Sequence, residues 1–159
     1  IFHRGFVPLW NMADSGCDKK ERFCVDVITC AAPYLGKRIR FLGNEQAEDV
    51  TGILNIFDCL ITDYSSVSWD VYYLGKPILF YQFDLDKYNE TNGSYIDMEK
   101  DLFGERCLTR EELLPKIHEY YENGFKEKTA YAEMRKKYLA YHDHNNRRRT
   151  YEFIKDQGY

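Results

Sequence analysis

Short apolar runs alternate along the chain with segments whose apolar residues recur at helical spacing. The runs at 58–63 and 78–81 are bounded by polar residues, which is typical of buried parallel strands. A roughly alternating stretch at 38–42 predicts a further short strand. Helical spacing predicts helices at 47–57 and 67–74, and also at 21–32, where a strand is the alternative. Strands and helices that alternate over short connections indicate an α/β fold with a Rossmann-like parallel sheet flanked by helices.

Outside this central pattern the prediction is less regular. Ile1-Phe2 resembles the end of a strand, and residues 6–20 are predicted to form a loop. The segment 82–108 is acidic and aromatic, and a connection of that length is usually functional or partly helical. A capping box of Thr109 and Glu112 opens a helix that ends near residues 123–124, and further helices are predicted at about 126–141 and 146–156. We therefore expect one domain over residues 1–159, with C-terminal helices at about 110–157.

Composition excludes several classes of protein. A chain of 159 residues with 44% hydrophobic and 30% charged residues can bury a core, and it is neither a disordered tail nor a membrane-embedded protein. The net charge of -4 argues against general nucleic-acid binding. The 5 cysteines form no CxxC pair, which predicts reduced thiols, with Cys59 in the core. Because the chain starts at Ile1 with strand-like residues, we expect a fragment of a longer protein.

Candidate chemistry gathers where the strand at 58–63 ends. Ligands of open α/β sheets bind beyond the carboxyl ends of the strands, and Ser65 and Ser66 lie at such an end and open a helix. Helix amides and two hydroxyls can bind a phosphate there, or a serine can simply cap the helix. His3 can reach the same crevice as a proton donor, or face solvent. Its neighbour Arg4 can pair with phosphate, or be solvated.

Other polar residues favour structural interpretations. Asp63 and Asp70 are expected to hold the loop through hydrogen bonds to backbone N–H groups, and their spacing does not indicate an acid/base pair. The segment 142–144 contains two histidines, but neighbours at a helix end converge poorly on a metal ion. Residues 147–149 are three arginines, predicted to form an exposed helix face, with contact to acidic lipid or polymer phosphate as the alternative. The chain has no GxSxG, Walker or GxGxxG motif.

A family resemblance adds to this picture. Four blocks follow one another in the chain, namely Asp58–Val67, Trp69-Asp70, Gly75–Tyr81 and Asp84–Tyr88. Over about residues 47–97 they resemble the CDP-glycerol glycerophosphotransferases, which include the teichoic acid primases and polymerases. The resemblance implies the C-terminal, donor-binding half of a GT-B fold, in which two Rossmann-like domains face a cleft.

The resemblance also implies roles for particular residues. Ser65 and Ser66 match the serines at the donor phosphates, and we expect the charge of Arg4 to add a further phosphate ligand beside them. His3 matches the histidine of a Lys-Pro-His-Pro element, although its context here is Phe-His-Arg-Gly. The residues expected to shape the site are Asp63, Tyr64 and Asp70, and those expected at the cytidine base are Gly43, Asn44 and Glu45. No metal and no cofactor are expected.

The implied reaction transfers a polyol phosphate, most simply glycerol phosphate, from a CDP-alcohol to a polymer or lipid-linked acceptor. CMP leaves, with assistance from His3, and the base that activates the acceptor belongs to an N-terminal domain that this chain lacks. We therefore expect donor binding without turnover, in a protein that acts at the cytoplasmic face of the membrane. Asn92-Gly93 and Phe103-Gly104 replace the family's Arg-Gly and Pro-Gly in loops expected to border the donor, which leaves the polyol open.

Two other functions remain compatible with the residues. One is a non-catalytic α/β interaction domain whose crevice no longer binds nucleotide, as the altered loops would allow. The other is a GT-B sugar transferase that uses a UDP- or CMP-sugar. The nucleotide preference distinguishes the sugar transferase from the polyol-phosphate transferase.

Overall fold

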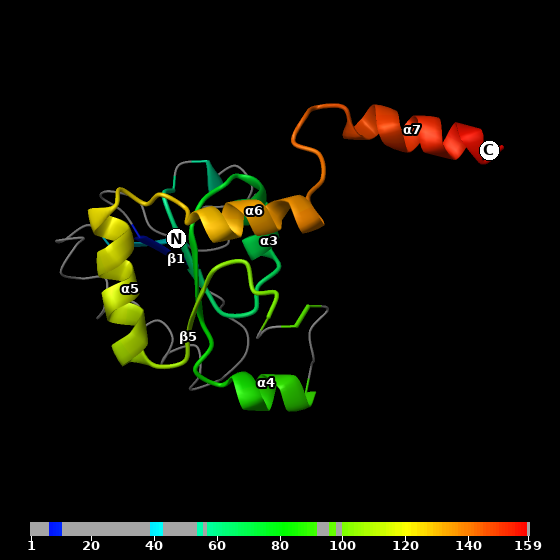
Figure 1. Cartoon of the computed structure of the whole chain (residues 1–159). Coiled ribbons are helices and arrows are strands. Elements are labelled where there is room, and N and C mark those ends of the chain that lie inside the picture. Colours follow the sequence, from blue (N-terminus) through cyan, green and yellow to red (C-terminus); the bar gives the residue numbers. More distant parts are fainter. Residues whose placement is uncertain are drawn as a thin grey trace.

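The computed structural model describes residues 7–10, 39–42, 54–55, 57–91, 96–97 and 100–158. In this part of the chain the strands are β1 (Val7–Trp10), β2 (Ile39–Leu42), β3 (Leu60–Thr62), β4 (Ile78–Tyr81) and β5 (Glu105–Cys107). The helices are α3 (Val67–Tyr73), α4 (Leu85–Thr91), α5 (Arg110–Glu122), α6 (Thr129–Tyr138) and α7 (Asn146–Asp156). Figure 1 shows their arrangement.

The centre of the fold is a three-stranded parallel sheet in the order β3-β4-β5. All residues of β3 and β4 are buried, as their continuous apolar runs predicted, and α3 is the crossover between these two strands. The predicted α/β fold with a parallel sheet flanked by helices is therefore confirmed. The long segment 82–108 is partly helical, since it contains α4, and it also contributes β5, which the sequence pattern did not predict.

The two N-terminal strands form a sheet of their own. β1 pairs with β2 in parallel, with Val7 opposite Ile39. The strand at 38–42 is thus confirmed, but the loop predicted for residues 6–20 is wrong at its start, where β1 lies. Pro8 is tolerated in β1 because, among the described residues, this strand pairs on one side only. The predicted strand at 1–2, the helix at 21–32 and most of the helix at 47–57 lie outside the described residues.

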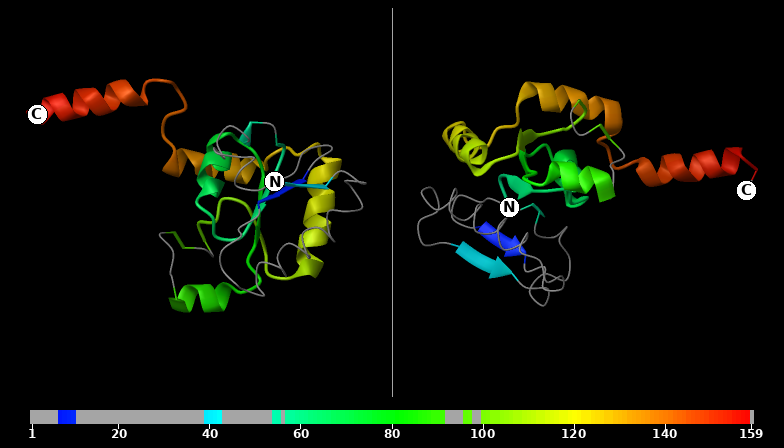
Figure 2. Two further views of the ribbon diagram at one scale, coloured as in Figure 1. Left: turned by 180° about the vertical axis from the view of Figure 1, so that it is seen from behind. Right: turned by 90° about the horizontal axis from the view of Figure 1, so that it is seen from below.

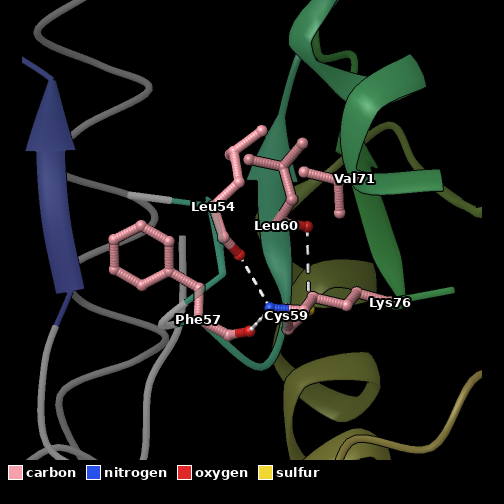
Figure 3. A pocket seen from close by; sticks show the side chains of 6 residues that line it. All are labelled: Leu54, Phe57, Cys59, Leu60, Val71 and Lys76. Atoms are coloured by element: carbon pink, nitrogen blue, oxygen red, sulfur yellow. Dashed lines mark hydrogen bonds between the residues drawn. The ribbon is translucent and has the colours of Figure 1, made fainter. Parts of the chain in front are cut away.

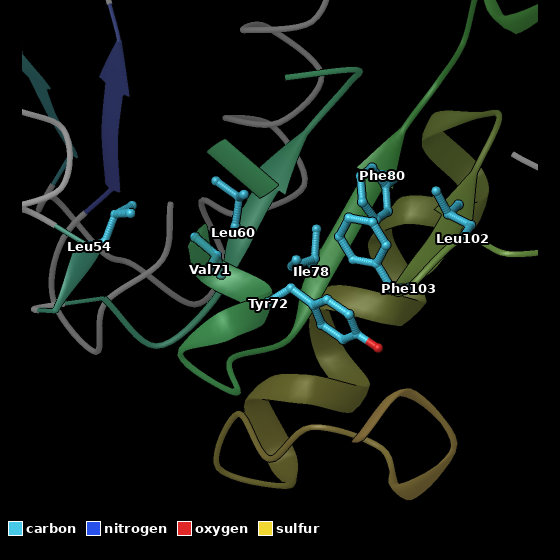
Figure 4. Close-up of a cluster of buried hydrophobic side chains, with 8 residues drawn as sticks. All are labelled: Leu54, Leu60, Val71, Tyr72, Ile78, Phe80, Leu102 and Phe103. Atoms are coloured by element: carbon cyan, nitrogen blue, oxygen red, sulfur yellow. The ribbon is translucent and has the colours of Figure 1, made fainter. Parts of the chain in front are cut away.

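A cluster of buried side chains joins the sheet to α3 (Figure 4). The ring of Phe103 lies 4.3 Å from Trp69 and 4.4 Å from Tyr72, measured between ring centroids. Phe103 is only 2% exposed, so the expectation that it borders the donor is wrong. Its neighbour Gly104 makes a close approach to β4, because a Cβ there would lie 2.5 Å from the carbonyl oxygen of Ile78. Phe103 is therefore a core residue, and the type of residue at this position does not indicate which polyol the donor carries.

Lys76 ties the start of β4 to the segment that leads into β3 (Figure 3). Its ammonium group donates to the carbonyl oxygen of Leu54 at 2.7 Å and also to those of Asn55 and Phe57. Burial lowers the pKa of Lys76. The hollow around it is lined by apolar side chains, Cys59 among them, and forms part of the core.

The C-terminal helices begin with the predicted cap. The Glu112 amide donates to the Thr109 hydroxyl at 3.3 Å, whereas the Glu112 carboxylate accepts from the amide of Leu108, one residue earlier than in a standard capping box. α5 packs on the sheet through Leu113 and Ile117. α7 extends away from the rest of the chain, and Figure 2 shows this from two further directions. The predicted helices at 126–141 and 146–156 are confirmed as α6 and α7, each within a few residues.

Candidate functional site

The candidate site lies beyond the carboxyl ends of β3 and β4. Residues 63–66 connect β3 to α3, and residues 82–84 connect β4 to α4. Because β3 and β4 are adjacent and parallel, both connections leave the sheet at the same edge. Ser65 and Ser66 are exposed at this edge. The fold therefore places the predicted phosphate-binding serines where ligands of α/β sheets bind.

The two serines do not cap α3 with their side chains. Ser66 occupies the N-cap position with φ -61° and ψ -19°, and its hydroxyl makes no capping bond. A capping side chain reaches the helix amides from an extended backbone, whereas Ser66 is helical. The capping alternative is therefore wrong in this structure. The carbonyl oxygens, by contrast, are used, since those of Ser65 and Ser66 accept from the amides of Ser68 and Trp69 at 3.1 and 3.0 Å.

Several hydrogen-bond donors remain available at this point. Within the described part of the chain, the hydroxyls of Ser65 and Ser66 have no hydrogen-bond partner. The backbone amides of Ser65, Ser66 and Val67 likewise have no hydrogen-bond partner among the described residues. Adjacent hydroxyls and amides directed outward from a strand-to-helix turn can bind an anion such as a phosphate.

The two aspartates expected to hold the loop behave differently. The carboxylate of Asp63 accepts from the amide of Tyr64 at 2.6 Å, so the structural role expected for Asp63 is confirmed. Asp70 lies in the first turn of α3 and is exposed, and its carboxylate makes no hydrogen bond within the described residues. The expectation that Asp70 holds the loop is therefore wrong.

Tyr64 connects the serine loop to α4. Its hydroxyl donates to the carboxylate of Asp84 at 3.1 Å. Its ring lies parallel to that of Tyr88, with centroids 3.6 Å apart and an interplanar angle of 6°. Burial raises the pKa of Tyr64, and the nearby Asp84 carboxylate raises it further, so the phenol keeps its proton and remains a donor.

Sequence reasoning assigned Tyr64 to the site but gave no role to Asp84 and Tyr88. The signal was present, because residues four apart lie on one face of a helix and both belong to the block that resembles the family. The sequence pattern does not show which residue contacts this face of α4. The tertiary structure shows that Tyr64 does.

The remaining predicted site residues lie outside the described residues. These are His3, Arg4, Gly43, Asn44 and Glu45, together with the altered pair Asn92-Gly93. Their roles stay predictions.

The C-terminal polar residues have structural partners. His142 stacks on Tyr73 with centroids 4.6 Å apart, and the residues that the structure describes contain no cluster of three metal-ligating side chains. Arg148 pairs with Glu152 on α7, and Arg149 pairs with Asp143 in the segment before this helix. The predicted exposed helix face is confirmed for Arg147 and Arg148, whereas Arg149 is half-buried. Among the described helices, none combines the length and the apolar character needed to span a membrane.

Comparison with known proteins identifies close sequence similarity to enzymes of cell-wall polymer synthesis. A teichoic acid glycerol-phosphate transferase of Staphylococcus aureus is 48% identical over 58 residues, which are 36% of this chain and 15% of that protein. The minor teichoic acid biosynthesis protein GgaB of Bacillus subtilis is 31% identical over 102 residues, which are 64% of this chain and 11% of that protein. The chain thus spans only a small part of the length of these relatives.

The fold and the family agree with this similarity. A solved structure of a variant of the wall teichoic acid polymerase TagF superposes with a TM-score of 0.62 at 21% identity, and covers 97% of this chain and 44% of that chain. The α/β sheet with its helices therefore corresponds to part of the GT-B-like TagF fold. Residues 34–156 match the family described as CDP-glycerol:poly(glycerophosphate) glycerophosphotransferase. Because this match covers most of the sequence, the chain belongs to that glycerophosphotransferase family of teichoic acid synthesis.

Proposed function

We propose that this chain binds the CDP-alcohol donor, with CDP-glycerol as the first candidate, for transfer of a polyol phosphate to a polymer or lipid-linked acceptor. The observation that carries the proposal is the group of exposed donors at Ser65 and Ser66, which have no internal partner among the described residues. These donors lie at the ligand-binding edge of the sheet in a chain of the glycerophosphotransferase family. A related TagF structure was soaked with CDPG.

The proposed chemistry is an in-line displacement at the β-phosphorus of the donor. An acceptor hydroxyl oxygen forms the new bond to that phosphorus, and the bond to the oxygen bridging the two phosphates breaks. CMP leaves with this oxygen and with the negative charge that develops on it. Hydrogen bonds from the Ser65 and Ser66 hydroxyls and nearby amides would stabilise that charge.

Other parts of the proposal rest on the sequence and on the family resemblance. His3 would donate a proton on the leaving side, and Arg4 would pair with a phosphate. Gly43, Asn44 and Glu45 would contact the base through backbone atoms. Hydroxyls, amides and the histidine would take the place of a metal ion at the diphosphate, and the base that activates the acceptor would come from an N-terminal domain. The full protein would act at the cytoplasmic face of the membrane.

Calorimetric titration of the chain with CDP, CMP, UDP and CDP-glycerol in EDTA tests the proposal. We expect metal-independent binding that favours CDP and CDP-glycerol. The double variant Ser65→Ala, Ser66→Ala should weaken CDP binding by about 1–3 kcal/mol for each lost charge-assisted contact. Thr150→Ala is the control, because this hydroxyl lies on the exposed α7 and bonds its own helix.

Three outcomes would contradict parts of the proposal. Unchanged affinity in the double serine variant would refute the phosphate assignment. Preference for UDP would favour a sugar transferase. Transferase activity from these 159 residues alone would refute the expectation that the chain binds without turnover.

A further inference from the structure

We propose that Tyr64 is a positioning residue for the donor-phosphate site, acting through a Tyr64 cluster that consists of Tyr64, Asp84 and Tyr88. The cluster holds the serine loop, residues 63–66, against α4. The inference rests on the proposed function, because it assigns the cluster to the site formed by Ser65 and Ser66. It goes further by naming the contact that sets the positions of their donor groups.

This cluster joins the serine loop to an element that is distant in the sequence. The other hydrogen bonds of residues 63–66 are local, joining Tyr64 to Asp63 and the loop carbonyls to the start of α3. Within the described part of the chain, the hydrogen bond from the Tyr64 hydroxyl to Asp84 is the one that connects this loop to another element, across 20 positions of sequence. The ring stack on Tyr88 joins the same two elements.

α4 depends on the contact in the same way. This helix has 7 residues and buries none of them, so it has little packing of its own to fix its position. Asp84 precedes the helix, and its carbonyl oxygen accepts from the amide of Tyr88 at 3.0 Å, which is the first bond of the helix. The side chains of Asp84 and Tyr88 therefore contact Tyr64 from one helical turn. The aromatic stack and the hydrogen bond fix both the distance and the rotation of the loop relative to that turn.

The position of Tyr64 in the chain makes this contact relevant to the donor. Tyr64 directly precedes Ser65, so a rotation of its backbone would move the hydroxyls and amides that follow. Half-burial and the Asp84 carboxylate keep its phenol protonated, so the hydrogen bond persists at neutral pH. Donor groups fixed before the ligand arrives cost less entropy on binding than groups that must be ordered by it.

Single substitutions separate the two parts of the cluster. Tyr64→Phe removes the hydrogen bond and keeps the stack, whereas Tyr88→Ala removes the stack. Tyr88→Phe and Asp84→Asn are the conservative variants, because the first keeps a ring and the second keeps an acceptor oxygen. Tyr151→Phe is the matched control, since Tyr151 is 66% exposed on α7.

Each variant is measured in two ways. Calorimetry gives its affinity for CDP, and amide hydrogen exchange without ligand gives the opening of residues 63–69, in which Ser68 and Trp69 bond the loop carbonyls. We expect Tyr64→Phe and Tyr88→Ala to weaken CDP binding about three- to tenfold and to speed exchange in this segment. Tyr88→Phe should match the wild type in both measurements. Asp84→Asn should weaken CDP binding less than Asp84→Ala, a further variant that removes the acceptor of the Tyr64 hydroxyl altogether.

The outcomes separate this inference from the proposed function. If the wild type binds CDP and Tyr64→Phe and Tyr88→Ala bind it equally well, the positioning role is wrong and the proposed function stands. Faster exchange with unchanged affinity would likewise leave the cluster a structural contact only. If the wild type binds no nucleotide, the proposed function fails, and the positioning role fails with it.

Discussion

The ammonium group of Lys128 lies 2.7 Å from the carboxylate of Glu105, which links the approach to α6 with β5. The same carboxylate contacts Lys116 of α5 at 2.8 Å and accepts a hydrogen bond from the hydroxyl of Tyr120 at 3.3 Å. Glu105 is only 8% exposed, so its charge depends on these partners. One buried carboxylate thus holds the last strand of the sheet to the two segments that cover it.

Substitution Glu105→Gln should destabilise the fold. The amide keeps the shape of the carboxylate but removes its charge, so Lys116 and Lys128 keep only the more exposed Glu119 as a carboxylate partner. We expect the free energy of unfolding to fall by about 1–3 kcal/mol. Urea denaturation at neutral pH measures this loss. Glu152→Gln is the control, because Glu152 forms an exposed pair on α7, and its substitution should change stability by less than about 1 kcal/mol. Equal stability of Glu105→Gln and the wild type would contradict the assigned role.

The same carboxylate should make stability fall in acid. Burial opposes its charge, but hydrogen bonds and charges from Lys116 and Lys128 prevail and lower the pKa of Glu105. A carboxylate whose pKa is lowered by folding stabilises the protein above its unfolded pKa, and this stability is lost as the pH falls through the folded pKa. Denaturation at several pH values between about 7 and 3 should show that loss, and a shallower dependence in Glu105→Gln. The lowered pKa of Glu119 contributes in the same direction, so the dependence should become shallower without disappearing.

Gly104→Ala should destabilise the sheet without touching the serine loop. Its Cβ would lie 2.5 Å from the carbonyl oxygen of Ile78 and 2.9 Å from the ring of Phe80, so β5 must move away from β4. We expect a loss of about 1–3 kcal/mol in the free energy of unfolding. Thr150→Ala provides the comparison, because this side chain is exposed on α7 and its hydroxyl bonds its own helix. A loss in Gly104→Ala no larger than that in Thr150→Ala would show that β5 can shift freely.

Phe103→Leu should lower stability and leave donor binding unchanged. Phe103 packs against Trp69, Tyr72 and Phe80 in the core, and a smaller apolar side chain costs about 1 kcal/mol of packing. Thermal unfolding measures the loss, and titration with CDP and with different CDP-alcohols measures binding. A changed preference among CDP-alcohols would contradict the core assignment and would restore this position to the donor site.

The local pattern of apolar and polar residues was sufficient to predict the secondary structure of the segment 58–81. β3, α3 and β4 follow directly from two apolar runs and one helical period, and the serines at the end of β3 could be selected because ligands bind at that edge. β5 could not be predicted in the same way. It has three residues and carries Glu105 and Arg106, so its pattern resembles a loop. It becomes a strand because Gly104 permits a close approach to β4 and because lysines from later segments neutralise the buried Glu105.

The features of the candidate site also fall into two groups, those set by neighbouring residues and those set by tertiary contacts. The sequence by itself determined which residues lie at the carboxyl end of β3, since strand, turn and helix are set by neighbouring residues. The tertiary structure alone decided that the hydroxyls of Ser65 and Ser66 stay free of the helix, that Asp70 does not support the loop, and that Phe103 belongs to the core. It also decided that Tyr64 meets Asp84 and Tyr88. The physical reason is that contacts between residues 20 or more positions apart depend on how the strands pair and the helices pack, which no local period encodes.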